Sequence, residues 1–171
     1  MAKSSTKKKR LSDGRPLQQY AALPYVRNED GEIEILVMSS RETRRVVIPK
    51  GWPIRNRKSW KTAEIEARQE AGLVGEVGHR SIGKYQYWKR LPASFVLVKV
   101  SVYPLRVTRQ LTDWPEKHER TQSWMAPQDA ATLIDETELG DLILEFARSL
   151  DTKPKAATRR RRQSSGAQPS A

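Results

Sequence analysis

Two glutamates stand four residues apart in the middle of the chain, in a segment that reads as a short helix. Glu66 and Glu70 follow the loop Pro49–Ile54, and a glycine, Gly72, comes soon after them. Residues at i and i+4 of a helix lie on one face, about one turn apart. Carboxylates placed in this way either repel each other in solvent or share a hard cation such as Mg²⁺. The second alternative would make the protein a metal-dependent enzyme.

The segment that carries these acids has the marks of a helix from Ser59 to Ala71. Ser59 is predicted to be its N-cap, and Gly72 suits the left-handed position at which many helices end. Ala63, Ala67 and Ala71 recur at helical spacing and form a small face that can pack closely on a sheet. The two glutamates border this face. We therefore expect them to lie along the sheet surface, which favours metal binding over idle surface charge.

Alternating apolar residues predict strands on both sides of this helix. The strands are expected at residues 18–26, 32–38, 46–48, 82–89, 93–103 and 120–125. The first two flank the polar turn Asn28–Gly31 and should form a β-hairpin. A second helix is expected from Asp135 to Leu150, with Thr137 as a candidate cap and Pro154 beyond its end. This order predicts an α+β fold, in which a mixed sheet packs between two helices as an α/β/α sandwich.

Positive charge is concentrated at the two ends of the chain. The whole sequence carries 32 Lys and Arg against 20 Asp and Glu, a net charge of +12. Residues 1–15 and 151–171 each hold six basic residues and one acidic residue, which leaves 20 basic and 18 acidic residues for 16–150. The pattern predicts one domain at 16–150 between two disordered basic tails. The tails either contact RNA or another anion non-specifically or only keep the protein soluble.

The chain has no cysteine, so it can form neither disulfides nor thiolate metal sites. This composition fits a reducing compartment and predicts a cytoplasmic protein. The apolar runs, such as Phe95–Val98, are far too short to cross a bilayer, so no membrane span is expected.

The loop and the helix together resemble the Nudix box. The pattern of that box is Gly, five residues, Glu, seven residues, then Arg-Glu-apolar-x-Glu-Glu-x-Gly-apolar. The matching positions in this chain are Gly51, Glu66, Ala67, Glu70, Gly72 and Leu73. The loop Pro-Lys-Gly-Trp-Pro and residues 83–90 are similar to bacterial members related to diphosphoinositol polyphosphate and diadenosine polyphosphate hydrolases. The resemblance covers residues 17–150 and implies a Nudix fold, whose element order is the one predicted above.

The resemblance implies that Glu66 and Glu70 are catalytic metal ligands for Mg²⁺, with Mn²⁺ as a substitute. Arg57 stands where the pattern has its first Glu, Ile65 replaces the Arg, and Gln69 replaces the first Glu of the Glu-Glu pair. Gln69 occupies a catalytic position, but its amide supplies only a neutral oxygen and cannot act as a base. Two interpretations follow: a phosphoanhydride hydrolase with an altered box, or a catalytically weakened protein that binds phosphorylated ligands or RNA.

Cations surround the predicted site. Residues 41–61 contain eight Lys and Arg and a single Glu, which favours a substrate with several phosphates, such as a diphosphoinositol polyphosphate or a dinucleoside polyphosphate. Some of these cations are expected to be solvated loop charges. The residues predicted to bind the substrate are Lys50, Arg57, Lys84, Lys89 and Arg90.

The remaining reactive residue types predict no second catalytic centre. His79 and His118 lack the spacing of a metal pair and are expected at the surface. Glu116 and Glu119 precede a late strand. In Nudix proteins such a loop can bring a further acid to the metal, but surface charge is the favoured interpretation for both.

Overall fold

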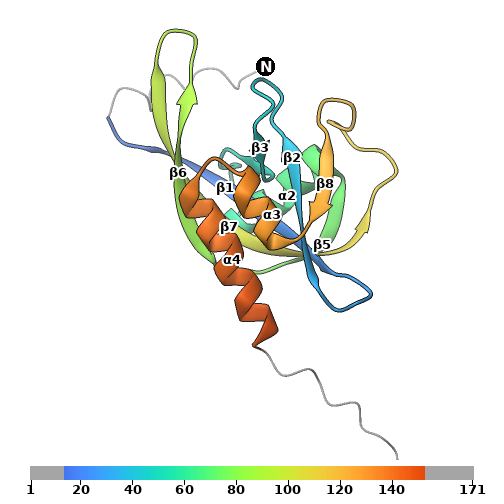
Figure 1. The fold of residues 1–171 in the computed structure, drawn as a ribbon. Coiled ribbons are helices and arrows are strands. Elements are labelled where there is room, and N and C mark those ends of the chain that lie inside the picture. The colour runs from blue at the N-terminus through green and yellow to red at the C-terminus, as the bar shows by residue number, and fades with distance from the viewer. Residues whose placement is uncertain (1–13, 153–171) are drawn as a thin grey trace, which may run out of the picture.

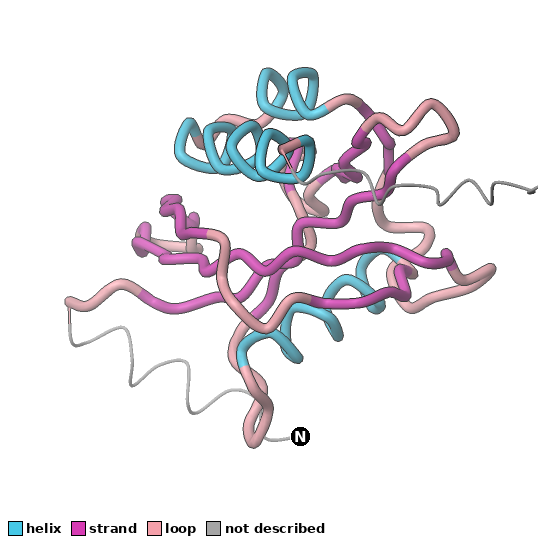
Figure 2. The backbone as a smooth tube through the Cα atoms, turned by 90° about the horizontal axis from the view of Figure 1, so that it is seen from below, coloured by secondary structure: helices cyan, strands magenta, loops and turns pink. Residues whose placement is uncertain are grey.

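The computed structural model describes residues 14–152. They form an eight-stranded mixed sheet with helices on both faces. Figure 2 shows this layering, with two helices on one side of the strands and one on the other. The predicted α+β class and the sandwich of a mixed sheet between helices are confirmed. Within the described range, every helix is too short or too polar to cross a bilayer.

The predicted basic tails fall almost entirely outside this range. Of residues 1–15 and 151–171, only 14, 15, 151 and 152 belong to the part that the structure describes. Pro154, predicted to lie beyond the end of the second helix, is also outside it.

The strands are in chain order β1 (Leu17–Arg27), β2 (Ile33–Ser39), β3 (Val46–Val47), β4 (Lys50–Gly51), β5 (Leu73–Val77), β6 (Gly83–Arg90), β7 (Phe95–Gln110) and β8 (Gln122–Met125). The hairpin of β1 and β2 is confirmed, with Tyr25 opposite Ile35. β1 also pairs in parallel with β7, from Leu17 opposite Val98 onwards. The sequence did not predict β4 or β5, because two and five residues are too few for a clear alternating pattern.

The helices in the described range are α2 (Ser59–Ala71), α3 (Pro127–Leu133) and α4 (Thr137–Asp151) (Figure 1). α2 packs on one face of the sheet through its alanines, and all three of them are fully buried. α3 and α4 pack on the other face. The prediction of only two helices was wrong, because α3 is a short helix that begins at a proline and lacks a long apolar period.

The predicted helix ends are partly corrected. Ser59 is the first residue of α2 and Lys58 takes the N-cap position, while the Ser59 hydroxyl shares a 2.7 Å hydrogen bond with the Tyr103 hydroxyl on β7. Thr137 is likewise the first residue of α4 and makes no side-chain cap. Gly72 ends α2 as predicted, with a φ of +68°. A Cβ at this glycine would lie 2.4 Å from the Trp114 ring, so the position also requires the absence of a side chain.

Candidate active site

Strand β4 places Gly51 directly against Glu66. Gly51 pairs with Tyr20 of β1, and a Cβ built on it would fall 2.1 Å from the Glu66 carboxyl carbon. Only glycine therefore lets the half-buried Glu66 carboxylate lie against this strand in its present position. The first position of the box and its first matching acid are thus in contact.

Glu70, one turn further along α2, is almost completely buried, with 9 % of its surface exposed. Its Oε2 accepts a hydrogen bond from the Lys50 backbone N–H at 3.1 Å. Its Oε1 accepts one from the Arg120 guanidinium at 3.0 Å. A carboxylate has about four lone-pair sites, so these two contacts fix Glu70 and still leave it able to accept a cation.

Burial brings the pKa values of Glu70 on α2 and Lys50 on β4 closer to neutral pH. It raises the pKa of Glu70 to about 7, although Arg120 and Lys50 act in the opposite direction. Burial also lowers the pKa of Lys50 to about 8, against the influence of Glu70 and Glu136. The Lys50 ammonium lies 5.3 Å from the centre of the Tyr87 ring on β6. Both groups can therefore change protonation in the range where a hydrolase works.

Arg120 is the site residue that sequence reasoning missed. Its side chain is 8 % exposed, and besides Glu70 it contacts the Glu116 carboxylate at 2.9 Å and the Ser39 carbonyl at 3.1 Å. Glu116 in turn forms an ion pair with Arg41 at 3.2 Å. Glu116 is therefore not a solvated surface charge, because its carboxylate contacts both Arg120 and Arg41. Only the i,i+4 spacing of Glu116 and Arg120 was visible in the sequence; the partner on α2 lies 50 residues away.

The connection from β7 to β8 brings Arg120 to the helix by covering the C-terminal end of α2. The Leu111 N–H donates to the Gly72 carbonyl at 2.8 Å, and the Glu116 N–H donates to the Gln69 carbonyl at 3.2 Å. The Ala71 carbonyl accepts from two glutamine side chains, one on β7 and one on β8. Carbonyl groups that a helix end leaves without partners are satisfied here by one continuous segment.

Two neighbouring positions on α2, Ile65 and Gln69, both depart from the box pattern. They are four residues apart on α2, so the pattern places an Arg and a Glu one turn apart, at the spacing of a helix ion pair. The chain replaces both members, and the Gln69 side chain is exposed while Glu70 beside it is buried. The guanidinium that contacts a box acid comes from Arg120 instead of from the helix.

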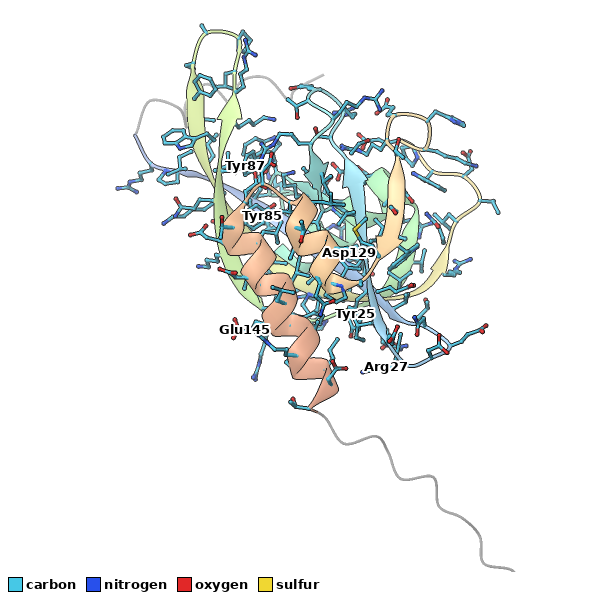
Figure 3. The ribbon with its side chains drawn as sticks, viewed as in Figure 1. Tyr25, Arg27, Tyr85, Tyr87, Asp129 and Glu145 are labelled. Carbon is cyan, nitrogen blue, oxygen red and sulfur yellow. The ribbon has the colours of Figure 1, made fainter. Side chains whose placement is uncertain are left out.

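β6 divides the predicted substrate-binding cations between the two faces of the sheet. Its residues alternate, and Tyr85 and Tyr87 lie on the face on which α3 and α4 pack (Figure 3). By the same alternation, Lys89 belongs to that face. Lys89 lies near enough to Lys50 to contribute to lowering its pKa. Lys84 and Arg90 are exposed on the opposite face.

The structure therefore places Lys50 beside Glu70 and Lys89 near Lys50, and it leaves the three other predicted cations exposed. Lys84 and Arg90 are on the outer side of β6, and Arg57 is exposed in the turn that precedes α2. Three further cations of the basic segment 41–61 are engaged in ion pairs: Arg41 with Glu116 and Glu119, Arg45 with Asp135 and Glu136, and Lys61 with Glu64. We refer to Lys50, Gly51, Glu66, Glu70, Lys89 and Arg120 as the carboxylate site.

Comparison with known proteins shows to which family the chain belongs. No protein-family model matches the chain. Nudix hydrolase 17, mitochondrial, of Arabidopsis thaliana is 30% identical over 128 residues, which are 72% of this chain and 68% of that protein. The chain belongs to the Nudix hydrolase family. It is accordingly a hydrolase that acts on pyrophosphate bonds, in a family that generally uses a divalent metal ion.

Solved structures confirm the Nudix fold. The Ap4A hydrolase of C. elegans, as a binary complex, superposes with a TM-score of 0.60 at 19% identity, over 79% of this chain and 98% of that one. The Nudix domain of Shewanella oneidensis NrtR, complexed with ADP ribose, gives a TM-score of 0.57 at 10% identity, over 77% and 88% of the two chains. The predicted Nudix-type α/β/α sandwich is thereby confirmed.

The acids of this Nudix box suit one hard cation. Mg²⁺ in proteins is commonly bound by one or two carboxylates, with water and substrate phosphates as the remaining ligands. Glu66 and Glu70 supply two carboxylates, and Gly51 leaves space for the first of them. Among residues 14–152 no group of three His, Asp or Glu side chains is arranged to hold a metal. The donor set therefore fits a cation shared with substrate, not one enclosed by protein ligands alone.

Proposed function

We propose that this protein is an Mg²⁺-dependent hydrolase of a phosphoanhydride bond in a substrate that carries several phosphates. A diphosphoinositol polyphosphate or a dinucleoside polyphosphate would suit it. The observation that carries the proposal is the position of two carboxylates, Glu66 and Glu70, beside the strand Lys50–Gly51 on the Nudix scaffold. The Ap4A hydrolase of C. elegans, which shares the fold, supports the dinucleoside polyphosphate class.

The roles of the residues follow from their chemistry. Mg²⁺, when bound, supplies positive charge that neutralises the phosphate oxygens. Glu66 and Glu70 would hold it, and we assign to the Glu66 carboxylate the acceptance of a proton from the attacking water. Attack of that water on phosphorus breaks the bridging P–O bond, and the bridging oxygen leaves with the second phosphate. Lys50 and Lys89 would bind phosphate oxygens that approach the two acids.

Three predicted residues take lesser roles in this proposal. The Gln69 amide oxygen would contact the hydrated cation from the exposed side of α2, without contributing charge. Arg57, Lys84 and Arg90 are exposed, and we assign to them contacts with the distant end of a long substrate. We further propose one hydrolase domain at 16–150 with basic tails at 1–15 and 151–171, and the lack of cysteine supports a cytoplasmic location.

The second candidate function is a weakened Nudix protein that binds phosphorylated ligands. The neutral Gln69 and the contact of Arg120 with Glu70 favour it, because both reduce the negative charge available to a cation. The Nudix domain of NrtR, which has the same fold, was crystallised with ADP ribose and supports the recognition of a phosphorylated ligand.

A substrate screen separates the two functions. The full chain would be incubated with diphosphoinositol polyphosphates and dinucleoside polyphosphates, with Mg²⁺, Mn²⁺ or a chelator, and the products identified by mass. We expect metal-dependent cleavage that falls by about a hundredfold in Glu70→Gln. Glu64→Gln is the matched control, because Glu64 is on the same helix but pairs with Lys61. Turnover that survives Glu70→Gln would remove the assignment, and turnover that appears only in Gln69→Glu would establish the binding protein.

A further inference from the structure

The β6–β7 hairpin has an outer face whose aromatic side chains the proposed hydrolysis does not use. The face is the surface formed by Lys84, Trp88, Arg90, Phe95, Leu97 and Lys99. The register places Trp88 opposite Leu97 and Arg90 opposite Phe95, so these side chains project from the same side of the two strands. Figure 1 shows the hairpin extending past the rest of the sheet.

Two aromatic rings on the outer face are unusually open to solvent. Trp88 is 63% exposed and Phe95 is 66% exposed. Within residues 14–152 the only other large hydrophobic side chain exposed to a similar degree is Leu133 on α3. Exposed aromatic residues gathered in one place are typical of a binding surface, whereas isolated ones are not. By the register, the two rings are diagonal neighbours on the paired strands.

Within the chain segment that carries these rings the charge has one sign, and one acid of α4, Glu138, accepts a hydrogen bond from the Gln86 N–H of β6. Between Glu76 and Asp113 the sequence holds seven Lys and Arg and no Asp or Glu. Three of these cations, Lys84, Arg90 and Lys99, lie on the outer face and are exposed. Among the residues that the structure describes, none of the three has an ion-pair partner. The surface is therefore complementary to an anion that also presents flat apolar groups.

The outer face is open because α2 stops short of it. α2 packs on the same side of β7, against Tyr103 and Leu105, and its first residue, Ser59, bonds to the Tyr103 hydroxyl. On this side of the sheet, no helix of the described range covers β6. The same is true of the part of β7 that precedes Tyr103. A strand-shaped ligand can therefore lie along the hairpin without displacing any part of the fold.

We propose that the outer face of the hairpin binds single-stranded nucleic acid. Bases stack on Trp88 and Phe95, and the phosphates between them contact Lys84, Arg90 and Lys99. By the register, cations flank the two rings: Arg90 lies opposite Phe95 near the tip, and Lys99 and Lys84 follow Trp88 toward the base of the hairpin. The tip, Leu91–Ser94, has neither an aromatic ring nor a cation, so the groups that would stack on bases and pair with phosphates lie on the flank of the hairpin. This surface contains no member of the carboxylate site, and it shares only Lys84 and Arg90 with the contacts proposed for a long substrate.

The test measures the binding of a labelled oligouridylate to the full chain by fluorescence anisotropy, at several salt concentrations. We expect Trp88→Ala and Phe95→Ala each to weaken binding by about five- to tenfold, because a base loses its stacking partner. Leu133→Ala is the matched control for an exposed apolar residue, and Arg148→Gln is the control for an exposed cation on α4. Both controls should bind as the unchanged protein does. Trp88→Phe keeps a flat ring and should recover most of the affinity.

Further probes separate stacking from charge. Inorganic polyphosphate has no bases, so its affinity should not change in Trp88→Ala. Hydrolysis of the pyrophosphate substrate should also be unchanged in Trp88→Ala, which shows that the variant is folded. Equal oligouridylate binding by Trp88→Ala, Phe95→Ala and the unchanged protein would overturn the proposal. Binding of phosphatidylserine vesicles through Trp88, without binding of the oligouridylate, would overturn it in favour of a membrane.

Discussion

The carboxylate site and the outer face of the hairpin both gather cations, but they hold them in opposite ways. In the carboxylate site, Arg120 is buried between Glu70 and Glu116, and Lys50 lies over an aromatic ring. On the outer face, the cations are exposed, and none of them forms an ion pair with a residue that the structure describes. Folding therefore fixes the geometry of the first group, whereas a ligand must organise the second. The number of cations does not distinguish the two regions; the burial of each one does.

Two single substitutions give the strongest test of whether the carboxylate site and the outer face act independently. Glu66→Gln should reduce pyrophosphate hydrolysis by at least about a hundredfold, because it removes the assigned proton acceptor. The same variant should bind the oligouridylate normally. Trp88→Ala should behave in the reverse manner in both assays. Loss of both functions in either variant would show that the two regions are one site.

Arg120→Gln should lower the free energy of unfolding by about 3 kcal/mol, because it leaves the buried Glu70 and Glu116 without their shared guanidinium. Chemical denaturation measures this change. Arg120→Lys should recover part of it, since the charge is kept but the forked geometry is lost. Arg106→Gln is the control: its pair with Glu76 is exposed, so its unfolding midpoint should not move. An equal effect of the two glutamine variants would contradict the burial argument.

The pKa of Glu70 predicts a pH dependence of stability in the metal-free protein. Between its ordinary value of 4.5 and about 7, the folded state holds a proton that the unfolded chain has released. The free energy of unfolding should therefore fall as pH rises through this range, by at most about 3 kcal/mol, and this contribution should level off above pH 7. Denaturation series in the presence of a chelator measure it. Glu70→Gln should remove this component, and an identical pH profile in that variant would refute it.

Gly51→Ala should affect activity more than stability. The added methyl group meets the movable end of the Glu66 side chain, so the carboxylate shifts while the strand remains paired. We expect about a tenfold loss of turnover, the size of effect that misplacement of a catalytic group produces. Thermal unfolding of the same sample should change little. A large fall in melting temperature with normal specific activity would contradict this account.

The smallest predicted difference is between two lysines of one strand. Lys89→Gln should raise KM for a polyphosphorylated substrate by about threefold, because Lys89 lies near Lys50, which is beside Glu70. Lys84→Gln should raise it by less, since Lys84 lies on the other side of β6. Steady-state kinetics of the two variants in parallel would sharpen the division between the faces. A larger effect of Lys84→Gln would reverse it.

Much of the carboxylate site could be predicted from the sequence because its parts are local. The alanine spacing, Gly72 and the box pattern placed Glu66 and Glu70 on α2, and the β1–β2 hairpin followed from its turn. Arg120 could not be predicted, because its contact with Glu70 depends on how the β7–β8 connection covers the helix end. The alternation of β6 was visible, but the face of the sheet that Lys89 shares with Lys50 depends on the pairing with β7.

The parallel pairing of β1 with β7 has a consequence for how the protein folds. Leu17 lies opposite Val98, so the centre of the sheet joins segments about 80 residues apart in the chain. Pairings between distant segments form slowly, because the loop between them must close before any contact is gained. During synthesis, β1 cannot pair with β7 until most of the domain has left the ribosome. We therefore expect α2 and the β1–β2 hairpin to form early, and the carboxylate site to be completed only in the last folding step.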